Sequence, residues 1–229
     1  MLRRIRRHPL ATCGILAPAV FFGASLAAAA AQPSYSSRTE DLSALAALNA
    51  RDAWIMVAGT VALGVMVIAF AIALLLHYDR RLRPAAYPLL VAGLATAARG
   101  GPADRLLSER VDAACAARSN AGLLSWHDEA HNLMAALLLV TFSLAPLVAA
   151  HRLRGSRETR RLAWASSAVA AAIAVLAAVY FSEVAGSWSG LVERVMAGLA
   201  LAWVAAAAWR LLSGPEPAPP DRARAAGAG

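Results

Sequence analysis

The chain has 229 residues, of which 59% are hydrophobic and only 16% are charged. This composition excludes an ordinary soluble domain, in which about 25% of the residues are charged. The net charge of +8 comes from 22 basic residues, all arginine, which fall in short clusters between apolar runs. Because they form no single basic stripe, the sequence favours a protein of the membrane over one that binds nucleic acid.

Six apolar segments predict membrane-spanning helices, so the predicted fold is an all-α integral membrane bundle. A helix needs about 20 mostly apolar residues to cross the hydrocarbon layer, and the third segment is shorter than this. The predicted spans are residues 9–31, 54–77, 85–98, 130–150, 162–182 and 191–211. They form one domain over residues 1–212, and the Pro/Ala-rich residues 213–229 are expected to be a disordered cytoplasmic tail.

The first apolar segment also has features of a secretory signal, because arginines precede it and small residues suited to cleavage follow it. Its apolar stretch is longer than the roughly 7 to 15 residues of a signal core. We therefore expect a retained span. Cleavage would leave five spans in the same orientation.

The distribution of arginine predicts the orientation in the membrane. With the N-terminus inside, 15 of the 22 arginines lie on the cytoplasmic side, and ten of the fourteen carboxylates lie on the other. Aromatic residues mark both boundaries: Trp54, Trp126, Tyr180 and Trp188 outside, and Tyr78, Tyr87, Trp164 and Trp209 inside. We predict a multi-pass protein of the bacterial cell (inner) membrane with both termini in the cytoplasm.

Two outer connections have helical patterns. Residues 37–52 open with a capping box, Ser37 and Glu40, and then place leucines at helical spacing. Residues 103–118 collect apolar side chains on one helical face after Pro102. Both segments predict short interfacial helices on the outer surface.

The order of several motifs resembles a known family. These are "YSSRTEDLSALAAL", a second span beginning "WIMVAGTVALGV", the turn "RGGPAD", "WHDEAHNLMAALLLV" and "GLVERVMAGLALAWVAAAAWRLL". The chain thereby resembles, over about residues 10–212, the bacterial and archaeal membrane family labelled domain of unknown function 998. The Gly-Leu-x-Glu-Arg opening of the last span and the His opening the fourth carry most of this resemblance. It implies a six-helix membrane protein and supplies no established activity.

The segment "SWHDEAH" before the fourth span suggests a metal site. His127 and His131 are four residues apart and share a helical face, a spacing that lets two imidazoles hold one zinc ion. The zinc-protease motif requires Glu directly after the first His, where this chain has Asp128, so that motif fails. A broader zinc site would add Asp41, Asp104 or Glu193. The alternative is a polar helix end in water, with acidic residues favoured in its first turn.

Glu193 and Arg194 stand at the outer start of the last span, where ionisable residues are rare unless they are paired or face a cavity. We expect Glu193 to face the bundle interior and to meet His127, His131 or Arg51. Arg194 is expected to meet Asp41 or Asp104. The alternative is a pair of solvated interfacial charges.

These features support three classes of function. The first is a membrane protein that binds a lipid, an ion or a partner at its acidic outer face without catalysing a reaction. The second is a membrane-embedded, metal-dependent hydrolase or lipid-modifying enzyme that uses His127, His131, Asp41, Asp104 and Glu193, with zinc as the cofactor. A small transporter comes third, because the spans have no run of charges at mid-membrane. The expected surroundings are the bilayer and a small molecule or lipid, not nucleic acid.

Overall fold

The computed structural model describes residues 9–47, 50–77, 80–98, 121, 126–155, 157, 159–182 and 184–213, without the side chains of residues 127 and 128. Within these residues the chain forms helices and no strands, which confirms the all-α fold class. The α-helices are α2 (Pro9–Ala30), α3 (Ala53–His77), α4 (Arg83–Ala98), α6 (Trp126–Leu153), α7 (Arg160–Phe181) and α8 (Ser189–Ser213). Two short 3₁₀-helices are η1 (Leu42–Ala46) and η3 (Gly186–Trp188). The predicted interfacial helix at 103–118 and the tail beyond Ser213 lie outside the described residues.

Each predicted span coincides with a helix to within a few residues at either end. Five of the helices, α2, α3, α6, α7 and α8, are long and apolar enough to cross a membrane. The helix α4 has only 16 residues, or roughly 24 Å at 1.5 Å per residue, which is less than the roughly 30 Å of the hydrocarbon core. The sixth span therefore stays a prediction.

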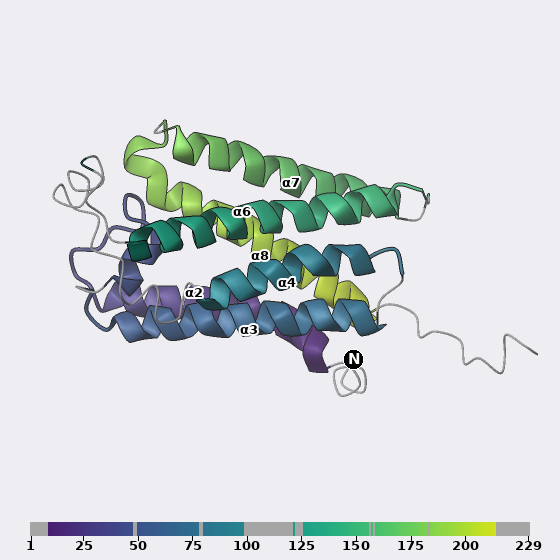
Figure 1. Cartoon of the computed structure of the whole chain (residues 1–229), viewed down its shortest axis with the longest axis horizontal. Helices are drawn as coiled ribbons and strands as arrows, with labels where there is room; N and C mark the ends of the chain where they lie inside the picture. Colours follow the sequence, from purple (N-terminus) through teal and green to yellow (C-terminus); the bar gives the residue numbers. More distant parts are fainter. Residues whose placement is uncertain are drawn as a thin grey trace, which may run out of the picture.

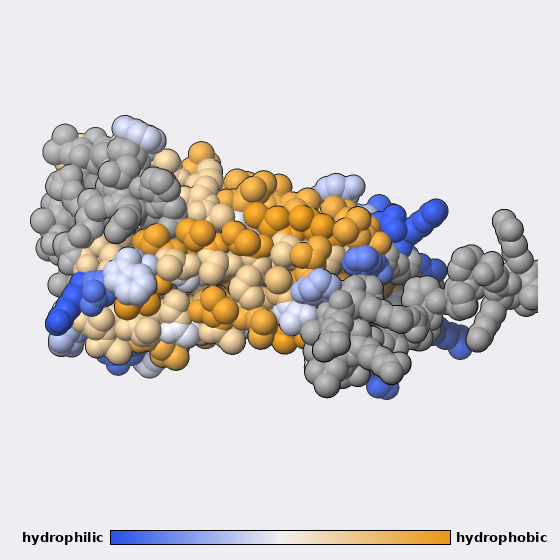
Figure 2. Space-filling model, turned by 90° about the horizontal axis from the view of Figure 1, so that it is seen from below, coloured by the Kyte–Doolittle hydropathy of each residue, from blue (hydrophilic) through white to orange (hydrophobic). Residues whose placement is uncertain are grey.

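The surface has the polarity of a membrane protein. Figure 2 shows hydrophobic residues over the middle of the molecule and hydrophilic residues toward both ends. Large apolar side chains of the helices face outward, among them Leu26, Leu94 and Val175, each at least 60% exposed. Soluble monomers rarely expose contiguous apolar surface on this scale. A lipid environment accounts for it, because it removes the cost of that exposure.

The six described α-helices lie lengthwise beside one another (Figure 1), and their contacts close into a ring. Each packs against its neighbours in chain order, and α2 closes the ring by packing against α8. We call the two ends of the ring the η1 end, where α2, α4 and α7 finish, and the arginine end, where α3, α6 and α8 finish. Of the twelve arginines whose side chains are described, nine lie at the arginine end, whereas all five described carboxylates lie at the η1 end.

Small residues allow close packing around α3. A Cβ on Gly59 would overlap Ala24 of α2, and a Cβ on Gly64 would lie 2.6 Å from the carbonyl oxygen of Gly93 in α4. Residues five apart point about 140° apart on a helix. The two glycines therefore serve two different neighbours of α3, in the manner of small-residue interfaces in membranes.

The segment between α2 and α3 differs from its prediction. The expected surface helix over 37–52 is instead the five-residue η1, and Leu42 and Leu45 are buried in the bundle at 3% and 0% exposure. The Glu40 carboxylate accepts a hydrogen bond from the backbone of Ser36, at 2.9 Å, rather than completing a capping box with Ser37. The physical reason is that the ring has an apolar interior, which these leucines cover at one end.

Candidate functional site

The first turn of α8 holds the 35–42 segment against the end of the bundle. Gly190 packs directly on the backbone of Glu40, where a Cβ would overlap the carbonyl oxygen. Next to it, the Leu191 N–H donates a hydrogen bond of 3.1 Å to the Arg38 carbonyl oxygen. The glycine of the Gly-Leu-x-Glu-Arg motif is thus required by a backbone crossing.

Arg194 fastens the same segment through its guanidinium group. Nη1 donates to the carbonyl oxygens of Glu40, at 2.9 Å, and Gly190, at 2.7 Å. Nη2 donates to the hydroxyl of Tyr35, and the guanidinium also lies 5.4 Å from the centre of that ring. Carbonyl groups and a phenol therefore hold Arg194, where we had expected the carboxylate of Asp41 or Asp104.

Tyr35 connects Arg194 to the backbone that leads into η1. Its hydroxyl donates to the carbonyl oxygens of Asp41, at 2.9 Å, and Glu40, at 3.2 Å. Burial raises the pKa of Tyr35 to about 12, although the charge of Arg194 and its hydrogen bond act in the opposite direction. The phenol is therefore neutral at physiological pH, and it can donate to a carbonyl while it accepts from Arg194.

Glu193 faces the bundle interior, as predicted, and meets the 37–52 segment. Its Oε2 atom accepts a hydrogen bond of 2.5 Å from the Leu42 N–H. That N–H belongs to the first residue of η1, where a helix leaves donors without internal partners and favours a negative charge. The predicted partner Arg51 points elsewhere: its side chain is 76% exposed, and its Nε atom lies 4.0 Å from Asp52.

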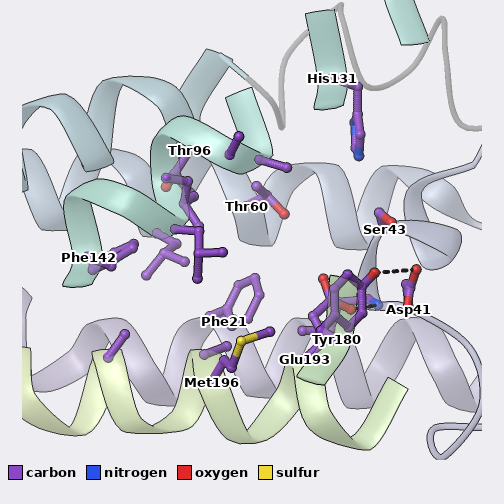
Figure 3. Close-up of a pocket in the computed structure, with 18 of the residues that line it drawn as sticks. Phe21, Asp41, Ser43, Thr60, Thr96, His131, Phe142, Tyr180, Glu193 and Met196 are labelled. Atoms are coloured by element: carbon purple, nitrogen blue, oxygen red, sulfur yellow. Dashed lines mark hydrogen bonds between the residues drawn. The ribbon is translucent and has the colours of Figure 1, made fainter. Parts of the chain in front are cut away.

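A cavity of about 350 Å³ lies inside the ring, beside η1 (Figure 3). All six α-helices and η1 contribute to its wall, which is mostly apolar. The hydroxyls of Thr60 and Thr96 also line it, but they donate to carbonyl oxygens of their own helices at 2.9 and 2.7 Å. Their protons are therefore engaged within the helices. The larger apolar lining residues are Phe21, Leu42, Met56, Leu63, Leu138, Leu139, Phe142, Ile173, Phe181, Met196 and Leu201.

The polar groups of the cavity gather toward the η1 end. Asp41 and Glu193 lie next to Tyr180 there, with His131 pointing toward them across the cavity (Figure 3). The Tyr180 hydroxyl donates to Asp41 Oδ2 at 2.8 Å. Within the part of the chain that the structure describes, the other oxygen, Oδ1, is buried and accepts no hydrogen bond. A buried carboxylate oxygen without a donor is costly, so this atom favours a ligand that donates.

One side of the cavity lies close to the surface at α6 and α7. Three of its lining residues, Asn132, Ala136 and Phe181, are also exposed, and Phe181 is 65% exposed. Because α6 and α7 are antiparallel neighbours, the start of α6 and the end of α7 lie at the same level of the bundle.

The structure brings three of the predicted site residues together, because Asp41, His131 and Glu193 line one cavity. His127 lies in the first turn of α6, but its side chain is outside the described atoms, and Asp104 is outside the described residues. Among the residues that are described, no group of three or more His, Cys, Asp or Glu could hold a metal ion. The zinc site, which needs His127, stays a prediction.

Sequence reasoning missed the roles of two tyrosines. Tyr180 was assigned to the outer aromatic belt, yet it points into the cavity and binds Asp41. Tyr35 opens the "YSSRTEDLSALAAL" stretch, whose resemblance to the family assigned it no role, and it binds Arg194. A tyrosine at a helix end suits both a membrane boundary and a polar cavity, so the sequence alone could not separate the two.

The fold and the site define a helical bundle with the span lengths and apolar surface of a multi-pass membrane protein, built around an internal cavity. The chain belongs to the family described as Protein of unknown function (DUF998), whose profile matches residues 15–210. No curated protein and no solved structure gives a significant match to the chain. The family description names no activity, so any function must be argued from the geometry of the cavity.

Proposed function

We propose that this protein is a multi-pass protein of the bacterial cell membrane that binds an amphipathic, lipid-like molecule in its central cavity. The apolar chain of the ligand lies among the residues of α2, α3, α6, α7 and α8, and its polar head lies at Asp41, Glu193 and His131. The observation that carries the proposal is a cavity that is apolar along most of its wall and acidic at one end.

Two features support a ligand drawn from the membrane. The volume of about 350 Å³ falls within the range of small-molecule sites, roughly 300 to 1,000 Å³. The lining residues Asn132, Ala136 and Phe181 of α6 and α7 are also exposed, which supports entry of an amphipath between these two helices. The charge distribution supports an orientation with the arginine end in the cytoplasm, because arginines accumulate on that side of bacterial membranes.

The test is to fill the cavity. Ala200 of α8 is a buried lining residue, and Ala174 of α7 is exposed and does not line the cavity. Native mass spectrometry of the protein released from maltoside micelles should show bound lipid-sized adducts, which Ala200→Phe removes and Ala174→Phe retains. Thermal unfolding of both variants verifies that they are folded. Equal adducts in the two variants would place the ligand elsewhere and refute the proposal.

A second function, an enzyme that modifies a lipid, is favoured by one observation. Two carboxylates and an imidazole, from Asp41, Glu193 and His131, line the same cavity, and such groups serve as general acids and bases. Incubation of the purified protein with vesicles of bacterial lipid extract, followed by mass spectrometry of the lipids, should then reveal a product that Asp41→Asn abolishes. If the lipids stay unchanged after prolonged incubation with excess substrate, binding remains the proposed function.

A further inference from the structure

The head group of the ligand can be inferred from the charges at the polar end of the cavity. We infer that the cavity takes a single-chain amphipath with a protonated amine as its head. This inference rests on the proposed function, and it adds the chemical class of the ligand.

The size of the cavity favours a ligand with one apolar chain. Its volume of about 350 Å³ lies near the lower bound of small-molecule sites, roughly 300 to 1,000 Å³. A single-chain amphipath therefore suits the cavity better than a lipid with two long chains.

The charges at the polar end favour a cation. Two carboxylates, Asp41 and Glu193, line this end, and among the described lining residues the single titratable base is His131. Arg194 follows Glu193 in the chain, but its guanidinium binds carbonyl groups and Tyr35 and does not line the cavity. A phosphate or carboxylate head would therefore meet like charges at short range, where the apolar wall reduces screening.

Hydrogen bonding at Asp41 also favours a cationic head. The Asp41 Oδ1 atom is buried and accepts no hydrogen bond from the described residues, whereas Oδ2 accepts from Tyr180. A carboxylate oxygen requires a donor, and an ammonium group offers three donors and no acceptor. Figure 3 shows Asp41 and Glu193 grouped with Tyr180 at one end of the cavity, with Phe21 and Met196 next to this group and Phe142 farther along. One end of a linear molecule can thus reach both carboxylates while its chain follows the apolar side chains.

Three probes of equal chain length test this inference: decylamine, decanol and decanoate at pH 7. Asp41→Asn removes one charge but keeps an oxygen that accepts from Tyr180. Asp52→Asn is the matched control, because Asp52 lies at the same end with its side chain 49% exposed and does not line the cavity. Each probe partitions into the micelle equally for all variants, so the apparent Kd from native mass spectrometry is compared between variants for one probe at a time.

We expect Asp41→Asn to raise the apparent Kd of decylamine by about tenfold or more. The apparent Kd of decanol should stay within about twofold, and that of decanoate should not rise. Asp52→Asn should change none of the three. If Asp41→Asn lowers the melting temperature by itself, Glu193→Gln is measured instead, with the same expected pattern. Equal losses for amine and alcohol, or an amine affinity that neither variant changes, would overturn the inference about the head group and leave the cavity as a chain-binding site. Binding of none of the probes to the wild-type protein would overturn the proposed function as well.

Discussion

Gly190 is the residue at which the site tolerates least change. Because a Cβ there would overlap the backbone of Glu40, Gly190→Ala must push the 35–42 segment away from α8. We expect this variant to lower the free energy of unfolding by roughly 1 to 3 kcal/mol, the usual cost of overpacking. Thermal unfolding in maltoside, followed by intrinsic tryptophan fluorescence, measures the effect.

Gly23 supplies the control for this substitution. It also lies within a helix, but a Cβ there would have no atom within 4 Å. Gly23→Ala should leave the melting temperature unchanged or raise it slightly, because alanine favours a helix over glycine. Equal melting temperatures for the two variants would contradict the close contact at Gly190.

The phenol of Tyr35 should lose its proton at a higher pH than an exposed tyrosine does. Burial raises its pKa from 10.0 to about 12, so the folded protein retains a proton that the unfolded chain has lost between these values. Its contribution to stability is therefore complete below about pH 10 and disappears as the pH rises through about 12. Difference absorbance near 295 nm should contain a tyrosine transition near pH 12 that Tyr35→Phe lacks. Identical titration curves for the two proteins would disprove the burial of this phenol.

At the scale of elements, α2 is an integral part of the ring. It packs against both α3 and α8, and its Phe21 side chain lines the cavity. Removal of this helix by signal cleavage would expose Phe70 of α3 and Ala208 of α8, which are fully buried beside Gly14 of α2, and would open the cavity along one side. We therefore predict that the mature protein retains α2.

The intact mass of a C-terminally tagged protein, purified from membranes, decides this prediction. The expected mass includes residues 9–30. A mass that corresponds to a chain beginning near Ala31 would show that the first helix is a signal peptide. The ring would then have five helices, and the cavity would be lined differently.

The whole molecule should cross the membrane with its arginine end in the cytoplasm. Single cysteines replacing Arg80, Arg157 and Ser187, all exposed, report its orientation in a background in which Cys13 and Cys115 are serine. A membrane-impermeant thiol reagent added outside intact cells, after the outer barrier is opened, should label the cysteine at position 187. The cysteines at 80 and 157 should react only after the inner membrane is permeabilised.

The same experiment tests whether α4 spans. If α4 did not cross, the connections at 80 and 157 would lie on opposite sides, because only α6 would separate them. If the cysteines at positions 80 and 157 were labelled from outside while the one at 187 was protected, the orientation would be the reverse of the predicted one.

The number and position of the helices follow from the sequence because they depend on local properties. An apolar run must satisfy its backbone hydrogen bonds within itself in lipid, so each of the six described helices could be located without knowledge of its neighbours. The inward position of Glu193 was also predictable, because a carboxylate inside a span requires a polar partner. The segregation of arginine and carboxylate to opposite ends is likewise a property of the chain order alone.

The cavity and the position of η1 beside it depended on the tertiary structure. The Leu42 N–H and Glu193 are 151 positions apart in the sequence, and no local pattern relates them. Tyr180 could point to lipid or to the interior until the packing of α6, α7 and α8 determined which face of α7 is enclosed. Residues 42–46 had an amphipathic pattern that suits a membrane surface, but the closed ring offered a nearer apolar surface, its own interior. Which apolar face meets which partner is a long-range property, and for this reason only the assembled bundle defined the site.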